Sequence, residues 1–115
     1  MINGKYGNKK TEVQGILFDS KRESERYKDL RMMEQVGVIS GLRLQPEYVL
    51  QEGFEVKNTK GGKNKIRAIK YRGDFEYWKN GLQYCEDTKG FKTEVYKLKK
   101  KMFLKKFPEI VFKES

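Results

Sequence analysis

Residues 74–90, DFEYWKNGLQYCEDTKG, contain the pattern that decides how this chain folds. Asn80-Gly81 separates two runs of alternating apolar and polar residues, a strong signal for a β-hairpin with a two-residue type I′ turn. Counting outward from that turn, Asp74 is expected to lie opposite Asp87. A loop of three or four residues would shift the register and separate the two acids.

Two carboxylates that face each other across a hairpin repel, and each raises the other's affinity for a proton. Lys89 falls on the same face as Asp87, with Arg72 opposite it in this register. A bound cation would stabilise the acids, because Mg²⁺ prefers carboxylate oxygens. A surface on which Arg72 and Lys89 neutralise the acids explains the same pattern. Glu86 points to the other face, opposite Phe75, and is not expected in this site.

Composition narrows the function classes. A length of 115 residues predicts one domain, and 37% hydrophobic residues suffice for a packed core. The net charge of +10, from 26 Lys and Arg against 16 Asp and Glu, favours a polyanionic partner. No apolar run approaches the roughly 18 residues that span a bilayer, and the N-terminus does not resemble a secretory signal. We therefore expect nucleic acid, and no membrane, as the partner.

The chain has no histidine, and Cys85 is its one cysteine. These facts exclude histidine-dependent triads and multi-cysteine zinc sites, and they favour a reducing, intracellular setting. Any hydrolytic chemistry would use carboxylates, lysine and a hard metal ion. The glycine-rich loop expected at 58–65 lacks the order of a phosphate-binding P-loop, so no nucleotide cofactor is expected.

Caps and apolar spacing predict the remaining elements. Residues 1–14 are expected to form a flexible basic arm or a plain disordered end, followed by a single domain at 15–115. A helix should begin after Ser20, with Glu23 completing a capping box, and end at Gly37.

Strands are expected at 42–50, 65–78, 82–90 and 110–112, with Pro46 favouring an edge or a bulge in the first. A second helix should lie between Thr93 and Pro108, with Val95, Leu98 and Met102 as its apolar stripe. This order, αβββαβ, predicts an α/β or α+β sandwich with a mixed central sheet flanked by helices.

The acid on the first helix has two explanations. As the third residue of a capping box, Glu23 needs no further role. At 100° per residue, however, it also lies on the inward face of the helix, near Tyr27 and Leu30, from which it could reach the sheet. Glu25 lies farther round the helix and is the second choice.

These residues resemble a known pattern. A Glu on the first helix, an Asp on a strand and D-x-K on the next strand are similar to the PD-(D/E)XK nuclease superfamily, whose core is αβββαβ. The segments FDSKRESERY, LQPEY, DFEY and EDTKGFKTEVYKLKKK resemble, more closely, an uncharacterised phage and prophage family placed in that superfamily. The resemblance covers about residues 5–113. The proline that usually precedes the first Asp is replaced by Gly73.

The resemblance implies roles for individual residues. Asp74 and Asp87 would bind Mg²⁺ or Mn²⁺, together with the backbone carbonyl of Thr88, and Lys89 would orient or activate the attacking water. Glu23 would complete the metal shell, directly or through water. Gln45 matches a polar position near the site.

The second helix adds a candidate surface for DNA. Its basic residues would contact phosphates or would simply form a solvated helix face. Lys99 falls inside the aromatic sector and would either extend to solvent or point toward the catalytic face. The candidate DNA-binding residues are Lys92, Lys97, Lys99, Lys100 and Lys101.

The resemblance implies a metal-dependent DNA endonuclease, similar to Holliday-junction resolvases, in the cytoplasm of a bacterial host and encoded by a phage or prophage. Paired cuts in branched DNA would require a two-fold symmetric homodimer. Two alternatives are a non-catalytic nucleic-acid-binding protein that keeps the nuclease fold and a phage protein that modulates a host enzyme.

Overall fold

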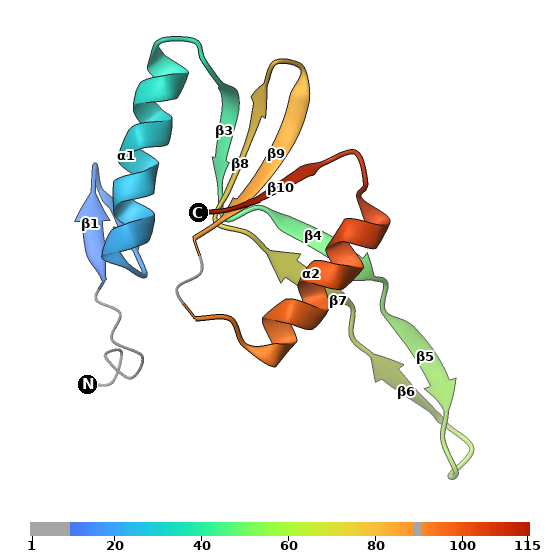
Figure 1. The fold of residues 1–115 in the computed structure, drawn as a ribbon. Helices are drawn as coiled ribbons and strands as arrows, with labels where there is room; N and C mark the ends of the chain where they lie inside the picture. The colour runs from blue at the N-terminus through green and yellow to red at the C-terminus, as the bar shows by residue number, and fades with distance from the viewer. Residues whose placement is uncertain (1–9, 89–90) are drawn as a thin grey trace.

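The computed structural model describes residues 10–88 and 91–115, in which two helices lie on opposite sides of a mixed sheet (Figure 1). The N-terminal elements are β1 (Thr11–Val13), β2 (Ile16–Phe18) and α1 (Lys21–Gln35). The expected arm therefore ends earlier than residue 14, because β1 pairs with β2; residues 1–9 of that arm lie outside the described residues.

Helix α1 begins and ends where its sequence predicts. The Ser20 side chain accepts a hydrogen bond of 3.1 Å from the backbone N–H of Glu23, which is the expected N-cap. Val36 caps the last turn, and Gly37 follows it with a φ of 84°, a conformation that glycine adopts without strain.

The central sheet has the strand order β10-β9-β8-β3. Strands β3 (Ser40–Leu44), β8 (Phe75–Lys79) and β9 (Leu82–Asp87) are antiparallel neighbours, and β10 (Val111–Glu114) joins β9 in parallel. The mixed αβ architecture is thus confirmed. Parallel addition of the last strand is possible because helix α2 (Glu94–Lys106) carries the chain back along the sheet (Figure 1).

The hairpin between β8 and β9 has the predicted register. Asn80 and Gly81 have φ values of 53° and 79°, as both central residues of a type I′ turn require. The ladder runs from the turn to the pair Phe75–Glu86 and stops there. Asp74 therefore lies just beyond the strand, where its N–H donates to the Glu86 carbonyl at 3.0 Å.

Two of the expected strands are each divided by a bend, and the two bends lie beside each other. The strand expected at 42–50 is divided at Gln45-Pro46 into β3 and β4 (Glu47–Gln51), and the strand expected at 65–78 is divided at Gly73 into β7 (Ile69–Arg72) and β8. Beyond the bend, β7 pairs with β4, so Arg72 faces Glu47 and does not continue the β8–β9 ladder. The two bends are joined by the Gly73 N–H to the Pro46 carbonyl at 3.0 Å.

The basic glycine-rich segment is a loop over residues 58–62, as predicted, but residues 63–65 belong to a strand. The loop joins β5 (Phe54–Lys57) to β6 (Lys63–Ile66) in a hairpin that extends away from the helices and the central sheet (Figure 1). The turn residues were recognised, but the short strands beside them carry too many lysines for a strand pattern to be visible.

Each face of the sheet has its own core. The α1 side is built on Phe18, Tyr27, Leu30, Ile39, Phe75 and Tyr77. The α2 side is built on Tyr48, Leu50, Tyr71, Cys85, Tyr96, Phe103 and Ile110.

The predicted apolar stripe of α2 was wrong at Val95 and Leu98, whereas its third member, Met102, packs against the core. Val95 and Leu98 are 62% and 59% exposed, whereas Tyr96 and Phe103 are buried. The aromatic sector turns inward because Phe103 packs edge-on against Tyr48, with ring centroids 4.9 Å apart, and a ring buries more area than Val or Leu.

Candidate active site

Two acids and a threonine lie together at one edge of the hairpin, where β8 begins and β9 ends. Oδ2 of Asp74 accepts hydrogen bonds of 2.7 Å from both the backbone N–H and the hydroxyl of Thr88. Asp87, the residue before Thr88, is fully buried, and its Oδ2 accepts a hydrogen bond from the Tyr71 hydroxyl. The fold thus brings Asp74 and Asp87 to one place through Thr88, although the strand ladder does not pair them.

Gly73 is required at this edge for two reasons. A Cβ atom at this position would lie 2.9 Å from Sγ of Cys85, too close for any side chain without movement of the buried thiol. The Gly73 N–H also donates to the Pro46 carbonyl, a bond that proline could not make. Glycine at this position therefore matches its surroundings in this chain.

Gln45 supports the same edge through its backbone. Its N–H donates to the carbonyl of Asp74 at 2.9 Å. Its φ of 51° places a non-glycine residue in the left-handed region, a conformation that carries strain and clusters at functional sites. The Gln45 side chain is exposed, so its contact with this edge is made by its backbone.

Glu23 is buried in the first turn of α1, with 5% of its surface exposed. It lies one turn before Arg26, which contacts the end of β9. Within the described residues, no three Asp, Glu, Cys or His side chains are grouped so that they could hold a metal ion. The predicted Lys89 lies outside the described residues. Glu25, the second choice, is exposed and pairs with Lys28 at 3.4 Å.

Glu86 has a structural role that was not predicted from the sequence. It is fully buried on the α1 side, where Arg26 donates to its two oxygens at 2.5 and 3.0 Å. The hydroxyls of Tyr77 and Ser115 also donate to it, at 2.8 and 3.0 Å. Burial alone would raise the pKa of Glu86, but the hydrogen bonds from Arg26 and Tyr77 outweigh that effect and hold the pKa below its ordinary value.

Tyrosine hydroxyls bind buried or half-buried acids at several points of the fold. Tyr48 donates to Glu76 at 2.8 Å, as Tyr71 does to Asp87. Burial raises the pKa of Tyr71, and the Asp87 carboxylate raises it further, so the tyrosine stays a donor. Burial also raises the pKa of Cys85 to about 12, so this thiol is not a nucleophile at neutral pH.

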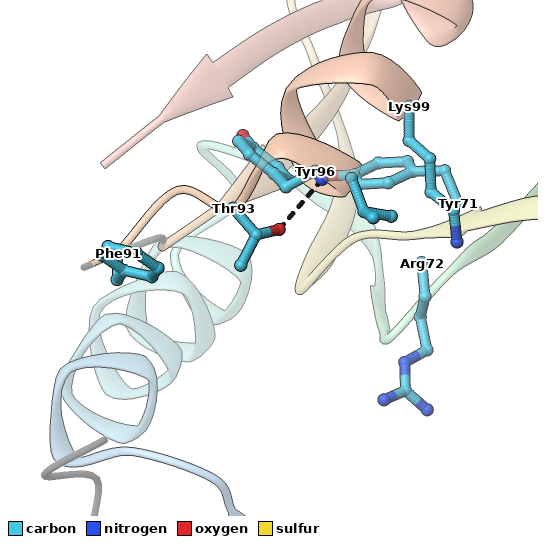
Figure 2. A pocket seen from close by; sticks show the side chains of 7 residues that line it. Tyr71, Arg72, Phe91, Thr93, Tyr96 and Lys99 are labelled. Carbon is cyan, nitrogen blue, oxygen red and sulfur yellow. Dashed lines mark hydrogen bonds between the residues drawn. The ribbon is translucent and has the colours of Figure 1, made fainter. Parts of the chain in front are cut away.

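A basic pocket of about 300 Å³ opens between β7 and α2 (Figure 2). In Figure 2 the Lys99 side chain extends from α2 toward Arg72 on β7, so two cations border one opening. Tyr71 also lines this pocket while its hydroxyl binds Asp87. Lys99 is half-buried and lines this pocket together with Tyr71. The pocket is lined by Tyr71, Arg72, Phe91, Thr93, Val95, Tyr96 and Lys99.

The other predicted DNA-binding lysines divide into two groups. Lys92 and Lys100 each lie 3.3 Å from a carboxylate oxygen of Glu114, and Lys100 is half-buried, so it is not part of a fully solvated helix face. Lys97 pairs with Glu94 at 3.2 Å on the exposed surface. Lys101 is exposed and borders a second hollow of about 470 Å³ along α2.

No helix among residues 10–88 and 91–115 is long and apolar enough to cross a membrane.

Comparisons with known proteins give one match, to a family. No curated protein and no solved structure matches the chain. Residues 3–114 match the family described as "Protein of unknown function (DUF1064)". Because this match extends over nearly the whole chain, the protein is a member of the DUF1064 family.

Proposed function

We propose that this protein is a metal-dependent DNA endonuclease. The observation that supports it is the meeting of Asp74 and Asp87 at adjoining strand ends, held there by Thr88 and Tyr71. Tyr71 also lines a pocket that is bordered by the cations Arg72 and Lys99. Burying one carboxylate next to another is unfavourable unless a cation or a proton accompanies them, so such an arrangement points to a functional site.

The donor set at this edge fits a hard cation. Mg²⁺ is often held by one or two carboxylates, with water and substrate phosphate as its other ligands. Asp74, Asp87 and the Thr88 carbonyl would hold Mg²⁺ or Mn²⁺. Glu23 would contribute through water, because no three acids among the described residues are grouped closely enough to bind one ion directly. The ion would supply an activated water and stabilise charge on the scissile phosphate.

The chain's own residues would position the ions and the substrate. The Thr88 N–H and hydroxyl orient the Asp74 carboxylate, and the Tyr71 hydroxyl orients that of Asp87. Lys89 would orient the attacking water. Lys99 and Arg72 would bind phosphate oxygens of the strand that enters the pocket, because charged donors form the strongest hydrogen bonds to phosphate.

A cleavage assay with labelled four-way junctions, nicked flaps and plain duplex, in Mg²⁺ or Mn²⁺, tests this proposal. We expect Asp87→Asn to lower the cleavage rate by at least about a hundredfold, because several kcal/mol of transition-state stabilisation would be lost. Lys89→Ala should have a similar effect. Asp29→Asn, the same change at an exposed position of α1, should cut as the wild type does.

Cleavage by Asp87→Asn at the wild-type rate, or undiminished cleavage after chelation of the metal, would refute the assignment. Branched DNA is the proposed substrate by analogy with small, basic junction-resolving nucleases of the superfamily that the chain resembles, and paired cuts would then require a homodimer. We place the protein in the cytoplasm of a bacterial host of a phage or prophage.

The net charge of +10 also favours a second candidate, a DNA-binding protein that keeps the fold without cutting. Salt-sensitive binding with no cleavage of any substrate would select it.

A further inference from the structure

The β5–β6 hairpin is an arm that pairs with no other strand of the described chain. Every residue of its two strands is exposed, and it extends beyond the helices and the sheet (Figure 1). The radius of gyration is 17.3 Å, larger than the roughly 13 Å expected for a compact domain of this size. A segment that buries so little cannot contribute much to the core, so its role lies at the surface.

The arm is well ordered by contacts within itself. At its tip, the Asn58 side chain accepts hydrogen bonds from the backbone N–H groups of Lys60 and Gly62, at 2.9 and 3.0 Å. At its base, a Cβ on Gly53 would lie 2.9 Å from the Ile66 carbonyl, so only glycine lets the two strands approach there. The tip and the base are therefore held in one conformation.

One face of the arm is strongly basic. The register of β5 with β6 pairs Glu55 with Lys65 and Lys57 with Lys63, and period-two alternation puts these four residues on the same face. Like charges directly opposite each other destabilise a hairpin. Lys63 lies 3.9 Å from Glu55, which leaves the face with a net excess of lysine. An anionic partner would relieve the repulsion between Lys57 and Lys63.

The arm also continues directly from the candidate site. The ribbon of β4 and β7 begins at Gln45 and ends at Gly73, both of which contact the edge that carries Asp74. From Gln45 to Lys57, the last residue of β5, the chain can extend at most about 40 Å at roughly 3.3 Å per residue. One turn of B-DNA measures about 34 Å, so the tip could reach one helical turn from the acids.

We propose that the β5–β6 arm is a second binding surface for double-stranded nucleic acid, contacting phosphates through Lys57, Lys63 and Lys65. A two-stranded ribbon fits the major groove of B-DNA, and its lysines then meet the phosphates on the groove edges. The choice of partner rests on the proposed function, but the surface binds whether or not the site cuts.

Equilibrium binding to a labelled 20-bp duplex, without divalent metal and at several NaCl concentrations, tests the arm. The variant Lys57→Gln/Lys63→Gln should bind more weakly, and its slope of log K against log[NaCl] should be smaller by about 1.8, at roughly 0.9 for each lost phosphate contact. The control Lys28→Gln/Lys79→Gln changes the net charge equally on α1 and at the β8–β9 turn, and should keep the wild-type slope.

Equal slopes for the arm variant and the control would overturn this inference, as would the absence of binding by the wild type. The two proposals fail separately. If the wild type cuts no DNA and the arm variant has a smaller salt slope, the proposal for the arm is supported and the proposal of a nuclease is refuted. Normal cleavage with an unchanged slope in the arm variant refutes the arm alone. Thermal denaturation of each variant confirms that these exposed substitutions leave the fold intact.

Discussion

At the scale of single residues, the candidate site depends on positions whose neighbours are distant in the sequence. Asp74 and Asp87 were expected from the hairpin turn, and the structure brings both to one edge. The need for Gly73 could not be predicted, because it arises from the Cys85 thiol on another strand. Glu86 was set aside on the sequence alone, since Arg26 lies on a helix whose packing no local pattern defines.

Gly73→Ala should destabilise the protein by about 1–3 kcal/mol, because the new methyl group would overlap Sγ of Cys85. The measurement is chemical denaturation of the single variants and of the double variant Gly73→Ala/Cys85→Ala. Since Cys85→Ala removes the overlapping atom, the double variant should lose less stability than the two single losses together. Gly62→Ala, in the exposed turn of the arm, brings a Cβ to 3.3 Å from the flexible end of the Asn58 side chain and should cost less than Gly73→Ala. Additive losses would contradict the close packing.

At the scale of elements, the ion pair of Arg26 with Glu86 joins α1 to the end of β9. Glu86→Gln should lower the free energy of unfolding by about 1–3 kcal/mol, because the half-buried guanidinium loses its counter-charge. Glu25→Gln removes an exposed partner of Lys28 on the same helix and should cost less than about 0.5 kcal/mol. Urea denaturation measures both. Equal effects of the two substitutions would show that the buried pair does not hold the helix to the sheet.

The faces of α2 illustrate what an element's own sequence leaves open. Its N-cap at Thr93 was predicted correctly, and the Thr93 side chain accepts from the Tyr96 N–H at 3.0 Å. Two sets of apolar residues recur at helical spacing along this helix, however, namely Val95 with Leu98 and Tyr96 with Phe103. The spacing alone does not decide which set is buried. The aromatic stripe is buried because Tyr48 and Tyr71 present rings to Phe103, contacts that only the assembled sheet supplies.

At the scale of the whole molecule, acids near the sheet make stability depend on pH. The pKa of Glu86 is lowered, as described above, and that of Glu114 is lowered chiefly by the hydrogen bond from Tyr96. A lowered folded-state pKa stabilises the protein above the ordinary value of 4.5, and that stability is lost as pH falls through the folded value.

Thermal denaturation followed by circular dichroism should therefore give midpoints that fall as the pH is lowered from about 5 to 3, at constant ionic strength. The midpoint of Glu86→Gln should begin lower and fall less steeply, because that side chain no longer titrates. Parallel curves for the wild type and this variant would show that Glu86 does not contribute to the pH dependence.

The sequence by itself determined the features whose bonds close within a few residues. These are the Asn80-Gly81 turn and its register, the caps at Ser20 and Thr93, and the position of both acids at one end of the hairpin. The hydrogen bonds that stabilise these features join residues close together in the sequence, so they form wherever these residues occur in this order.

Pro46 indicated an irregularity in the first strand, but only the tertiary structure decided the bend at Gly73, the inward face of α2 and the partner of Glu86. The β5–β6 arm belongs with these, because its exposure is a property of the assembled molecule. The physical reason is that burial, ion pairing and close packing depend on surfaces far apart in the chain, and a local pattern of residues carries no record of which surfaces will meet.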